Sequence, residues 1–358
     1  MGRSAVDGSL SDPETRGPGV VNAAAGMRRW HFSPGRGAVS APAVADGGVY
    51  VGNASEVYAV DAVTGQPWWR FSTALARIDT TPPAVVDGTV FIGTDDEAGH
   101  VYARDARTGR HIWKASTGAP VSSSSPAVVD GVVYVGNQKG LYALDAASGE
   151  RRWEFRPCAV FARPAVADGV LYVHAGGRDG GGLYAVDART GEQRWRFSTG
   201  REWNEESAPA VAGGMVHVGS GSSLYTVDAR TGRQRWTFLT GHYVTASPVT
   251  ANGTVYCGSW DRNLYALDAA TGGMRWTFAT AGAIASSAAV GGGLVYVGSR
   301  DFSLYAVDAA TGEKRWEFPT SDGVNAPAVV DGMAYIGTRD GHLHALRTPV
   351  PPPHEATA

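Results

Sequence analysis

The side chains that could do chemistry are concentrated in two segments near the middle of the chain. The first, Gly200-Arg-Glu-Trp-Asn-Glu-Glu206, holds three carboxylates and a tryptophan, and the second contributes His242 and Tyr243. A carboxylate such as Glu205 or Glu206 beside an imidazole can act as a general acid–base pair, because the two groups exchange a proton near neutral pH. If the site is catalytic, its candidate residues are therefore Glu206, His242 and Tyr243.

Two further arrangements have suitable residue types but no supporting motif. Cys158 and His242 are the types needed for a nucleophile and its base. Ligand types for a metal ion occur close together, without a recognised spacing, at four positions: Asp95, Asp96, Glu97 and His100. A solvated loop accounts for these four residues better than a metal site, so the sequence predicts no metal.

Other residues are better suited to binding than to catalysis. Trp203 and Trp260 fall outside a regular series of tryptophans, and aromatic side chains of this kind are good anchors for a partner. The candidate ligand- or partner-binding positions include six of the residues named above: Trp203, Glu205, Glu206, His242, Tyr243 and Trp260. Four further polar residues complete the set: Arg77, Asp79, Arg163 and Asn325. Together they predict a polar funnel for a small anion, a zwitterion or a peptide.

The regular tryptophans indicate the scaffold that must position these residues. Eight of them recur in steps of 39, 44, 40, 42, 41, 40 and 40 residues: Trp30, Trp69, Trp113, Trp153, Trp195, Trp236, Trp276 and Trp316. A period near 40 residues with one large aromatic per copy is typical of a radial or stacked repeat architecture.

Each repeat is predicted to contain four short strands, here named A to D. In one clear copy they lie in 287–292, 294–298, 304–308 and 315–318. Asp-Gly or Asn-Gly pairs suit the two-residue A–B turns, and Asp-x-x-Thr/Ser-Gly suits the C–D turns. No window has sustained helical periodicity, so an all-β fold is expected.

The number of strands predicts how the array closes. Eight A–B–C sets can be counted, yet the first D strand, 27–32, precedes them all, and the last set, 325–346, has no D strand after it. The N-terminal strand should therefore complete the last sheet and close a ring. The prediction is a single eight-bladed β-propeller over residues 20–347, with disordered tails at 1–19 and 348–358.

The two faces of such a disc should differ. The A–B and C–D turns lie on one face and are nearly uniform, whereas the B–C loops and D–A crossovers lie on the other face and vary between blades. We call the second the variable face and expect a specific site there. Recurring loops at Asp261, Arg300-Asp301 and Arg339-Asp340 are interpreted as turn chemistry and ion pairs between blades.

Composition excludes several classes of function. The net charge is −3 with no basic run, which disfavours nucleic-acid binding. No apolar run is long enough to span a membrane, and no signal peptide or lipidation cysteine is found. The chain as written is expected to be a cytoplasmic monomer, or extracytoplasmic if it is a fragment of a larger protein.

The motif Leu-Tyr-Ala-Leu/Val-Asp-Ala-x-Thr-Gly-x-x-x-Trp, at 264–276 and 304–316, resembles the pyrroloquinoline-quinone-type β-propeller repeat, also called the tryptophan-docking quinoprotein repeat. The resemblance covers residues 20–347. It implies that each regular tryptophan packs between adjacent blades. Members include quinone-dependent dehydrogenases, a lipoprotein that assists outer-membrane protein assembly, and sensor domains of bacterial kinases.

Quinone chemistry would require features that this chain lacks. The dehydrogenases are much longer, and neither an adjacent cysteine pair nor a set of calcium ligands can be identified here. The resemblance implies PQQ with calcium, but the residues do not support it, and no cofactor is predicted. The leading hypothesis is a non-catalytic binding module that presents the variable face to a protein, a peptide or a small ligand. The alternative is a small-molecule enzyme, such as a biosynthetic cyclase, lyase or hydrolase, with an acid–base site in the funnel. A quinone-dependent dehydrogenase is third.

Overall fold

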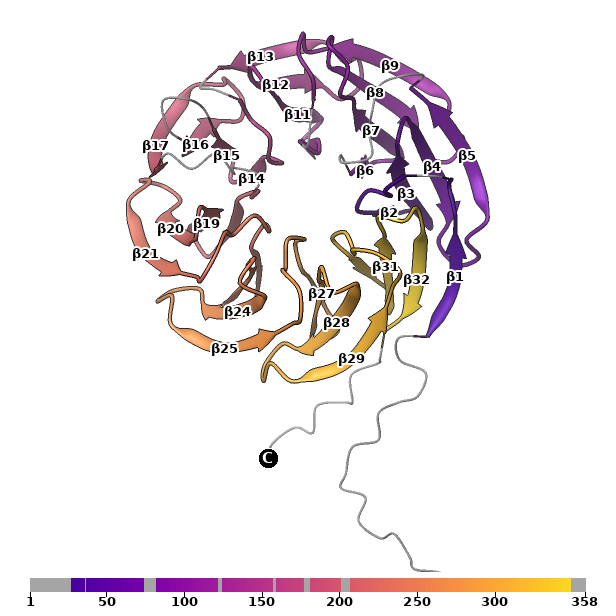
Figure 1. Ribbon diagram of the computed structural model, residues 1–358. Coiled ribbons are helices and arrows are strands. Elements are labelled where there is room, and N and C mark those ends of the chain that lie inside the picture. Colours follow the sequence, from indigo (N-terminus) through magenta and orange to yellow (C-terminus); the bar gives the residue numbers. More distant parts are fainter. Residues whose placement is uncertain are drawn as a thin grey trace, which may run out of the picture.

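Eight antiparallel sheets are arranged around a central axis in the computed structural model (Figure 1). The structure describes residues 27–35, 37–73, 82–121, 124–156, 159–176, 181–200 and 207–348. Every sheet has four strands, and the described residues contain no helix. The predicted all-β, eight-bladed propeller is confirmed. The two predicted tails lie outside the described residues, apart from Thr348.

The first four blades follow the chain from β2 to β17. Blade 1 contains β2 (Ala43–Ala45), β3 (Gly48–Asn53), β4 (Glu56–Asp61) and β5 (Pro67–Ser72). Blade 2 contains β6 (Ala84–Val86), β7 (Thr89–Gly93), β8 (His100–Asp105) and β9 (His111–Ser116). Blade 3 contains β10 (Ala127–Val129), β11 (Val132–Asn137), β12 (Gly140–Asp145) and β13 (Arg151–Phe155). Blade 4 contains β14 (Ala165–Ala167), β15 (Val170–Ala175), β16 (Gly181–Asp187) and β17 (Gln193–Gly200).

The remaining blades complete the ring. Blade 5 contains β18 (Ala210–Ala212), β19 (Met215–Ser220), β20 (Ser223–Asp228) and β21 (Gln234–Leu239). Blade 6 contains β22 (Val249–Ala251), β23 (Thr254–Gly258), β24 (Asn263–Asp268) and β25 (Met274–Ala279). Blade 7 contains β26 (Ala289–Gly291), β27 (Leu294–Gly298), β28 (Ser303–Asp308) and β29 (Lys314–Pro319). Blade 8 contains β30 (Ala328–Val330), β31 (Met333–Gly337), β32 (Leu343–Arg347) and β1 (Arg28–Phe32).

The ring closes in the predicted way. β1 pairs antiparallel with β32, with Trp30 opposite Ala345 and Phe32 opposite Leu343, so the N-terminal strand is the outer strand of blade 8. The inner strands are three residues long, shorter than the four to six that the sequence suggested. Each inner strand pairs with its neighbour only over the three residues next to the A–B turn, as Ala127–Val129 does with Val132–Tyr134.

The regular tryptophans join adjacent blades, as the resemblance implies. Trp195 of blade 4 donates its indole N–H to the carbonyl of Ala229 in blade 5 at 3.0 Å. Its ring lies against Gly232, where an added Cβ would come within 2.7 Å of it. Seven of the tryptophans make this bond: Trp30, Trp69, Trp113, Trp153, Trp195, Trp236 and Trp276. The eighth, Trp316, has no acceptor among the described residues, because its neighbour is the turn divided between the chain termini.

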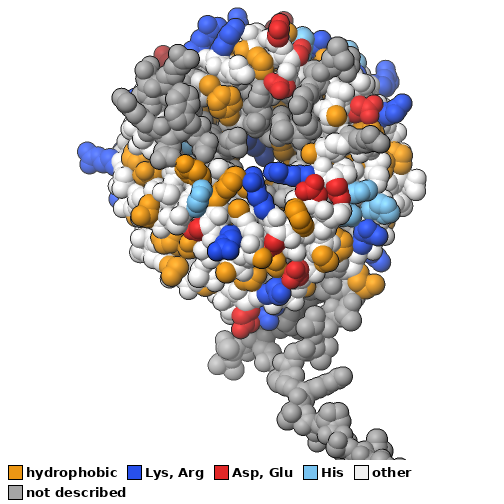
Figure 2. Space-filling view, in the orientation of Figure 1, with side chains coloured by type: hydrophobic (Ala, Val, Ile, Leu, Met, Phe, Trp, Pro, Cys, Tyr) orange, Lys and Arg blue, Asp and Glu red, His pale blue; other side chains and the backbone are white. Residues whose placement is uncertain are grey.

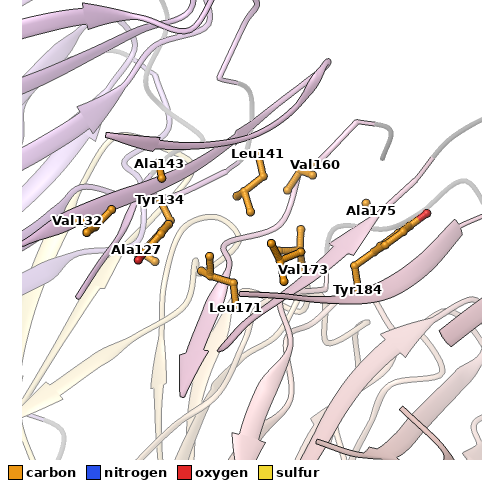
Figure 3. Packing of buried hydrophobic residues seen from close by; sticks show 11 residues of the cluster. Ala127, Val132, Tyr134, Leu141, Ala143, Val160, Leu171, Val173, Ala175 and Tyr184 are labelled. Atoms are coloured by element: carbon orange, nitrogen blue, oxygen red, sulfur yellow. The ribbon is translucent and has the colours of Figure 1, made fainter. Parts of the chain in front are cut away.

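Apolar side chains fill the space between blades. In the cluster between blades 3 and 4, Leu141 and Val160 face Leu171 and Val173, and all four are fully buried (Figure 3). Each such cluster draws on two neighbouring sheets, so the molecule has a ring of interblade cores. A crossover loop between two blades, such as the one that contains Val160, is therefore packed against both of them.

The D–A crossovers are fixed by a tight contact with the preceding blade. Gly258 ends β23, and an added Cβ there would lie 2.3 Å from Cγ2 of Ile284 in the crossover that follows β25. Ile284 is fully buried. The same arrangement of a strand-end glycine under a crossover valine recurs at Gly136 with Val160 and at Gly219 with Val244. Glycine is required here by close approach and not by an unusual backbone angle.

Replacing Gly258 by alanine should lower the free energy of unfolding by about 1–3 kcal/mol, because the new methyl group overpacks the contact with Ile284. Urea unfolding followed by tryptophan fluorescence measures the change. In a double-mutant cycle with Ile284→Ala, the cost of Gly258→Ala should fall because the clashing atom is gone. Equal costs in both backgrounds would contradict this explanation.

Candidate functional site

Three consecutive blades carry their most distinctive side chains at one loop position. In the B–C loops of blades 6, 7 and 8, that position holds Trp260, Arg300 and Arg339, and an aspartate follows each of them. Asp261 anchors its loop by accepting hydrogen bonds from the backbone N–H of Gly241 at 2.7 Å and from that of Asn263 at 3.0 Å. The loops are thus tied to the preceding crossovers, and the variable residue projects from a fixed frame.

The predicted turn chemistry of these loops is confirmed, but the predicted ion pairs of the arginines are not found. Asp301 accepts from the backbone N–H of Ala281 and of Ser303 and from the hydroxyl of Tyr305. Its carboxylate is therefore engaged by neutral donors. In the part of the chain that the structure describes, no carboxylate lies within ion-pair distance of Arg300 or Arg339.

Trp260 is the centre of a stacked arrangement. The guanidinium of Arg300 lies over its ring at 4.0 Å from the centroid, and the imidazole of His242 is stacked with it at 6.1 Å and 19°. The indole N–H donates to Oγ1 of Thr245 at 2.8 Å, which fixes the orientation of the ring. Tyr243 packs edge-on against His242 at 4.8 Å. We call His242, Tyr243, Trp260, Arg300 and Arg339 the aromatic–arginine patch.

A small pocket lies beside the patch, between blades 7 and 8. It has a volume of about 70 Å³, and its polar lining consists of Ser286, Ser299, Arg300, Asn325 and Arg339. The side chain of Arg300 is exposed, yet partial desolvation by the surrounding protein lowers its pKa, and the positive charge of Arg339 lowers it further. The two guanidiniums therefore repel each other. A bound anion would relieve this repulsion.

The patch unites three of the predicted site residues, His242, Tyr243 and Trp260, and the adjoining pocket includes a fourth, Asn325. The side-chain amide of Asn325 donates to the carbonyl of Val39, so it also links blade 8 to blade 1. Tyr243 N–H donates to Nδ1 of His242 at 2.8 Å, which leaves Nε2 as the protonated nitrogen of the neutral ring.

Arg163 lies apart from the patch, two residues before the start of β14 on blade 4. Its side chain is exposed, yet desolvation lowers its pKa. A guanidinium that is accessible to water but surrounded by protein fits a position at the central channel, which β14 lines as the inner strand of its blade (Figure 1).

The remaining predicted site residues, namely Arg77, Asp79, Trp203, Glu205 and Glu206, lie outside the described residues, as does Cys158. Nδ1 of His100 is hydrogen-bonded to the carboxylate of Asp96, and among the described residues no group of three or more His, Cys, Asp or Glu side chains could hold a metal ion. Burial raises the pKa of the Cys257 thiol to about 12, so this thiol stays protonated and unreactive at neutral pH.

Sequence reasoning missed Arg300 and Arg339 as site residues. Each precedes an aspartate, and the recurring Arg-Asp pair was interpreted as a structural ion pair. The signal that could have found them is the register with Trp260-Asp261. The aspartate is the common element of these loops, and the residue before it is the variable one.

Comparison with known proteins places these features in a family. The sequence model described as "Outer membrane protein assembly factor BamB" matches residues 19–154, 97–237, 179–288 and 261–348. The serine/threonine-protein kinase AfsK of Streptomyces coelicolor is 34% identical over 154 residues, which is 42% of this chain and 18% of the kinase. The quinohemoprotein alcohol dehydrogenase of Comamonas testosteroni is 29% identical over 142 residues, which is 34% of this chain and 20% of the enzyme. The matches thus span about a fifth of these relatives.

A solved structure supports the same fold. The crystal structure of BamB from Moraxella catarrhalis aligns with a TM-score of 0.72 and 19% identity over 90% of this chain and 99% of that one. The described residues include no helix that is long and apolar enough to cross a membrane.

Proposed function

This chain belongs to the PQQ-like propeller family described as outer membrane protein assembly factor BamB, and from that premise we propose that it is a non-catalytic binding module. Its partner is a protein or peptide, which it binds through the aromatic–arginine patch on the variable face. The observation that carries the proposal is the row of Trp260, Arg300 and Arg339 on three adjacent blades, with neither arginine paired to a carboxylate of the described chain.

The composition of the patch supports this proposal. Tryptophan, tyrosine and arginine are the residues that most often dominate the binding energy of protein interfaces. Tyr243 is 39% exposed although it is a large hydrophobic side chain. Trp260 is held by its hydrogen bond to Thr245 and by the cation–π contact with Arg300, which reduces the entropy lost when a partner binds.

The dimensions of the neighbouring pocket favour a macromolecular partner over a small substrate. Sites for drug-sized ligands usually enclose about 300–1,000 Å³, whereas this pocket has about 70 Å³. It can accept one functional group of a larger molecule. The family description, which names a protein assembly factor, points to the same class of partner. The monomeric state and the cytoplasmic location stay predictions from the sequence.

Panning a peptide library displayed on phage against the purified protein tests this function. Peptides should be enriched, and Trp260→Ala should weaken their binding by about tenfold or more, because truncating a central aromatic anchor costs about 2 kcal/mol. Val63→Ser is the matched control, since Val63 is 83% exposed in a C–D turn on the opposite face. Failure to enrich any peptide, or equal binding to Trp260→Ala and to the wild type, would refute the proposal.

A further inference from the structure

We infer, building on the proposed binding function, that the pocket between blades 7 and 8 recognises side-chain carboxylates of an acidic segment in the partner. Arg300 and Arg339 supply the charge, and Trp260 holds the first of them in place. The proposed function requires only that a partner bind at the patch. The present inference specifies the partner's chemistry.

The neutral side chains that line the pocket already donate hydrogen bonds within the protein. The hydroxyl of Ser286 donates to the carbonyl of Gly298 at 3.1 Å, and that of Ser299 donates to the carbonyl of Gly282 at 3.2 Å. The amide of Asn325 is engaged with Val39. Because these neutral lining groups are bonded within the protein, a ligand meets mainly the N–H groups of Arg300 and Arg339, and it must therefore supply acceptors.

The stacking of Arg300 on Trp260 prepares it to bind a carboxylate. The central carbon of the guanidinium lies over the indole, 4.0 Å from the ring centroid, and the N–H bonds of a guanidinium lie in its plane and point outward from its edge. A planar fork of this kind matches a carboxylate with two parallel hydrogen bonds. A pocket of about 70 Å³ has room for such a group.

A run of acidic side chains fits better than one terminal carboxylate. Arg300 and Arg339 stand on separate blades and repel each other, so a single negative charge leaves one of them uncompensated. In Figure 2, Lys and Arg side chains gather beside the central opening of the disc. Clusters of arginine are a common means of recognising acidic motifs, whereas chain termini are usually captured by backbone groups.

Fluorescence anisotropy with three labelled peptides tests the inference. The first is a glutamate-rich octapeptide with blocked ends, the second is its glutamine counterpart, and the third is the glutamine peptide with a free terminal carboxylate. We expect the acidic peptide to bind at least tenfold more tightly than the other two. Arg300→Gln and Arg339→Gln should each weaken its binding about tenfold, because hydrogen bonds to charged groups contribute about one such factor or more. The affinity should also fall as salt is added.

Arg189→Gln is the matched control, because it removes the same charge from an exposed C–D turn on the opposite face. A loss of affinity in Arg189→Gln equal to that in the patch variants would show that only net charge matters, which would overturn the inference. Equal binding of the glutamate and glutamine peptides would also overturn it, and so would tight binding of the free carboxylate alone. Library peptides that need Trp260 but tolerate Arg300→Gln and Arg339→Gln would refute the acidic ligand while leaving the proposed function standing.

Discussion

Replacing Trp236 by alanine should lower the free energy of unfolding by about 3–5 kcal/mol, the range found when large aromatic side chains are truncated in a core. Trp236 is 9% exposed, and its indole N–H donates to the carbonyl of Ala269 in the next blade at 3.0 Å. The substitution removes this bond and leaves a cavity above Gly272, whose Cα hydrogens face the ring. Because Trp236 belongs to blade 5 and contacts blade 6, the substitution weakens the packing between these two blades.

Urea unfolding at neutral pH measures this loss. Trp260→Ala is the matched control, since it removes the same side chain from a partly exposed loop and should cost far less stability than Trp236→Ala. The two variants thus distinguish a structural tryptophan from a binding tryptophan, because Trp236→Ala should lower stability and Trp260→Ala should lower binding. A similar loss of stability in both would contradict the distinction between regular and irregular tryptophans.

Mild acid should destabilise the protein strongly. Burial lowers the pKa of His174, His217 and His344 to about 4 in the folded protein, whereas an exposed imidazole titrates near 6.5. Between these two values the unfolded chain binds more protons than the folded one. The contribution of the neutral imidazoles to the free energy of unfolding is therefore fully present above about pH 7 and is lost as the pH drops toward 4. At pH 5 the loss is about 2 kcal/mol for each imidazole. Unfolding curves at pH 7.5 and pH 5 measure the difference.

His217 offers a specific test of this cause. In most blades the corresponding position is a tyrosine whose hydroxyl donates to a carbonyl of the next blade, as Tyr256 does to Ala309. In blade 5, Nε2 of His217 is buried without a partner in the described residues. His217→Tyr should stabilise the protein and remove its share of the acid sensitivity. An unchanged loss of stability between pH 7.5 and pH 5 in this variant would contradict the assignment.

The turn aspartates do not account for that loss. Backbone and arginine partners hold the pKa of Asp145 at about 2, as they do for Asp187 and Asp268. A carboxylate whose pKa is lowered contributes stability that is lost only as the pH falls below about 4. The imidazole and carboxylate contributions therefore act in separate pH ranges.

Most of the fold could be predicted because its determinants are local and repeated. Seven of the eight regular tryptophans pair with a turn glycine and a carbonyl of the next blade. A repeated pattern such as Thr231-Gly232 followed by Trp236 therefore predicts both the turn and the docking contact, in which Gly232 receives Trp195 of the preceding blade and Trp236 packs on Gly272 of the next. Closure was predictable too, since the unpaired strand at Trp30 needed a partner. The inner strands were less predictable, because the residues before them belong to the crossovers and do not pair with the second strand of the blade.

The site was only partly predictable because it depends on contacts between loops. Trp260 was predicted as an anchor because it falls outside the regular tryptophan series, and His242 as an acid–base candidate, and they lie stacked on each other. Arg300 and Arg339 looked like ordinary members of Arg-Asp pairs. Only the geometry reveals that each aspartate is engaged with the preceding crossover and with its own loop, which leaves the guanidiniums available.

Hydrogen–deuterium exchange of the protein with and without the tightest peptide from the library tests the central claim most directly. We expect slower exchange in the loops at 240–245, 258–263, 298–303 and 337–342, which form and surround the aromatic–arginine patch, and no change in the C–D turns of the opposite face. Protection that is confined to the opposite face, or that leaves these four loops unchanged, would contradict the account.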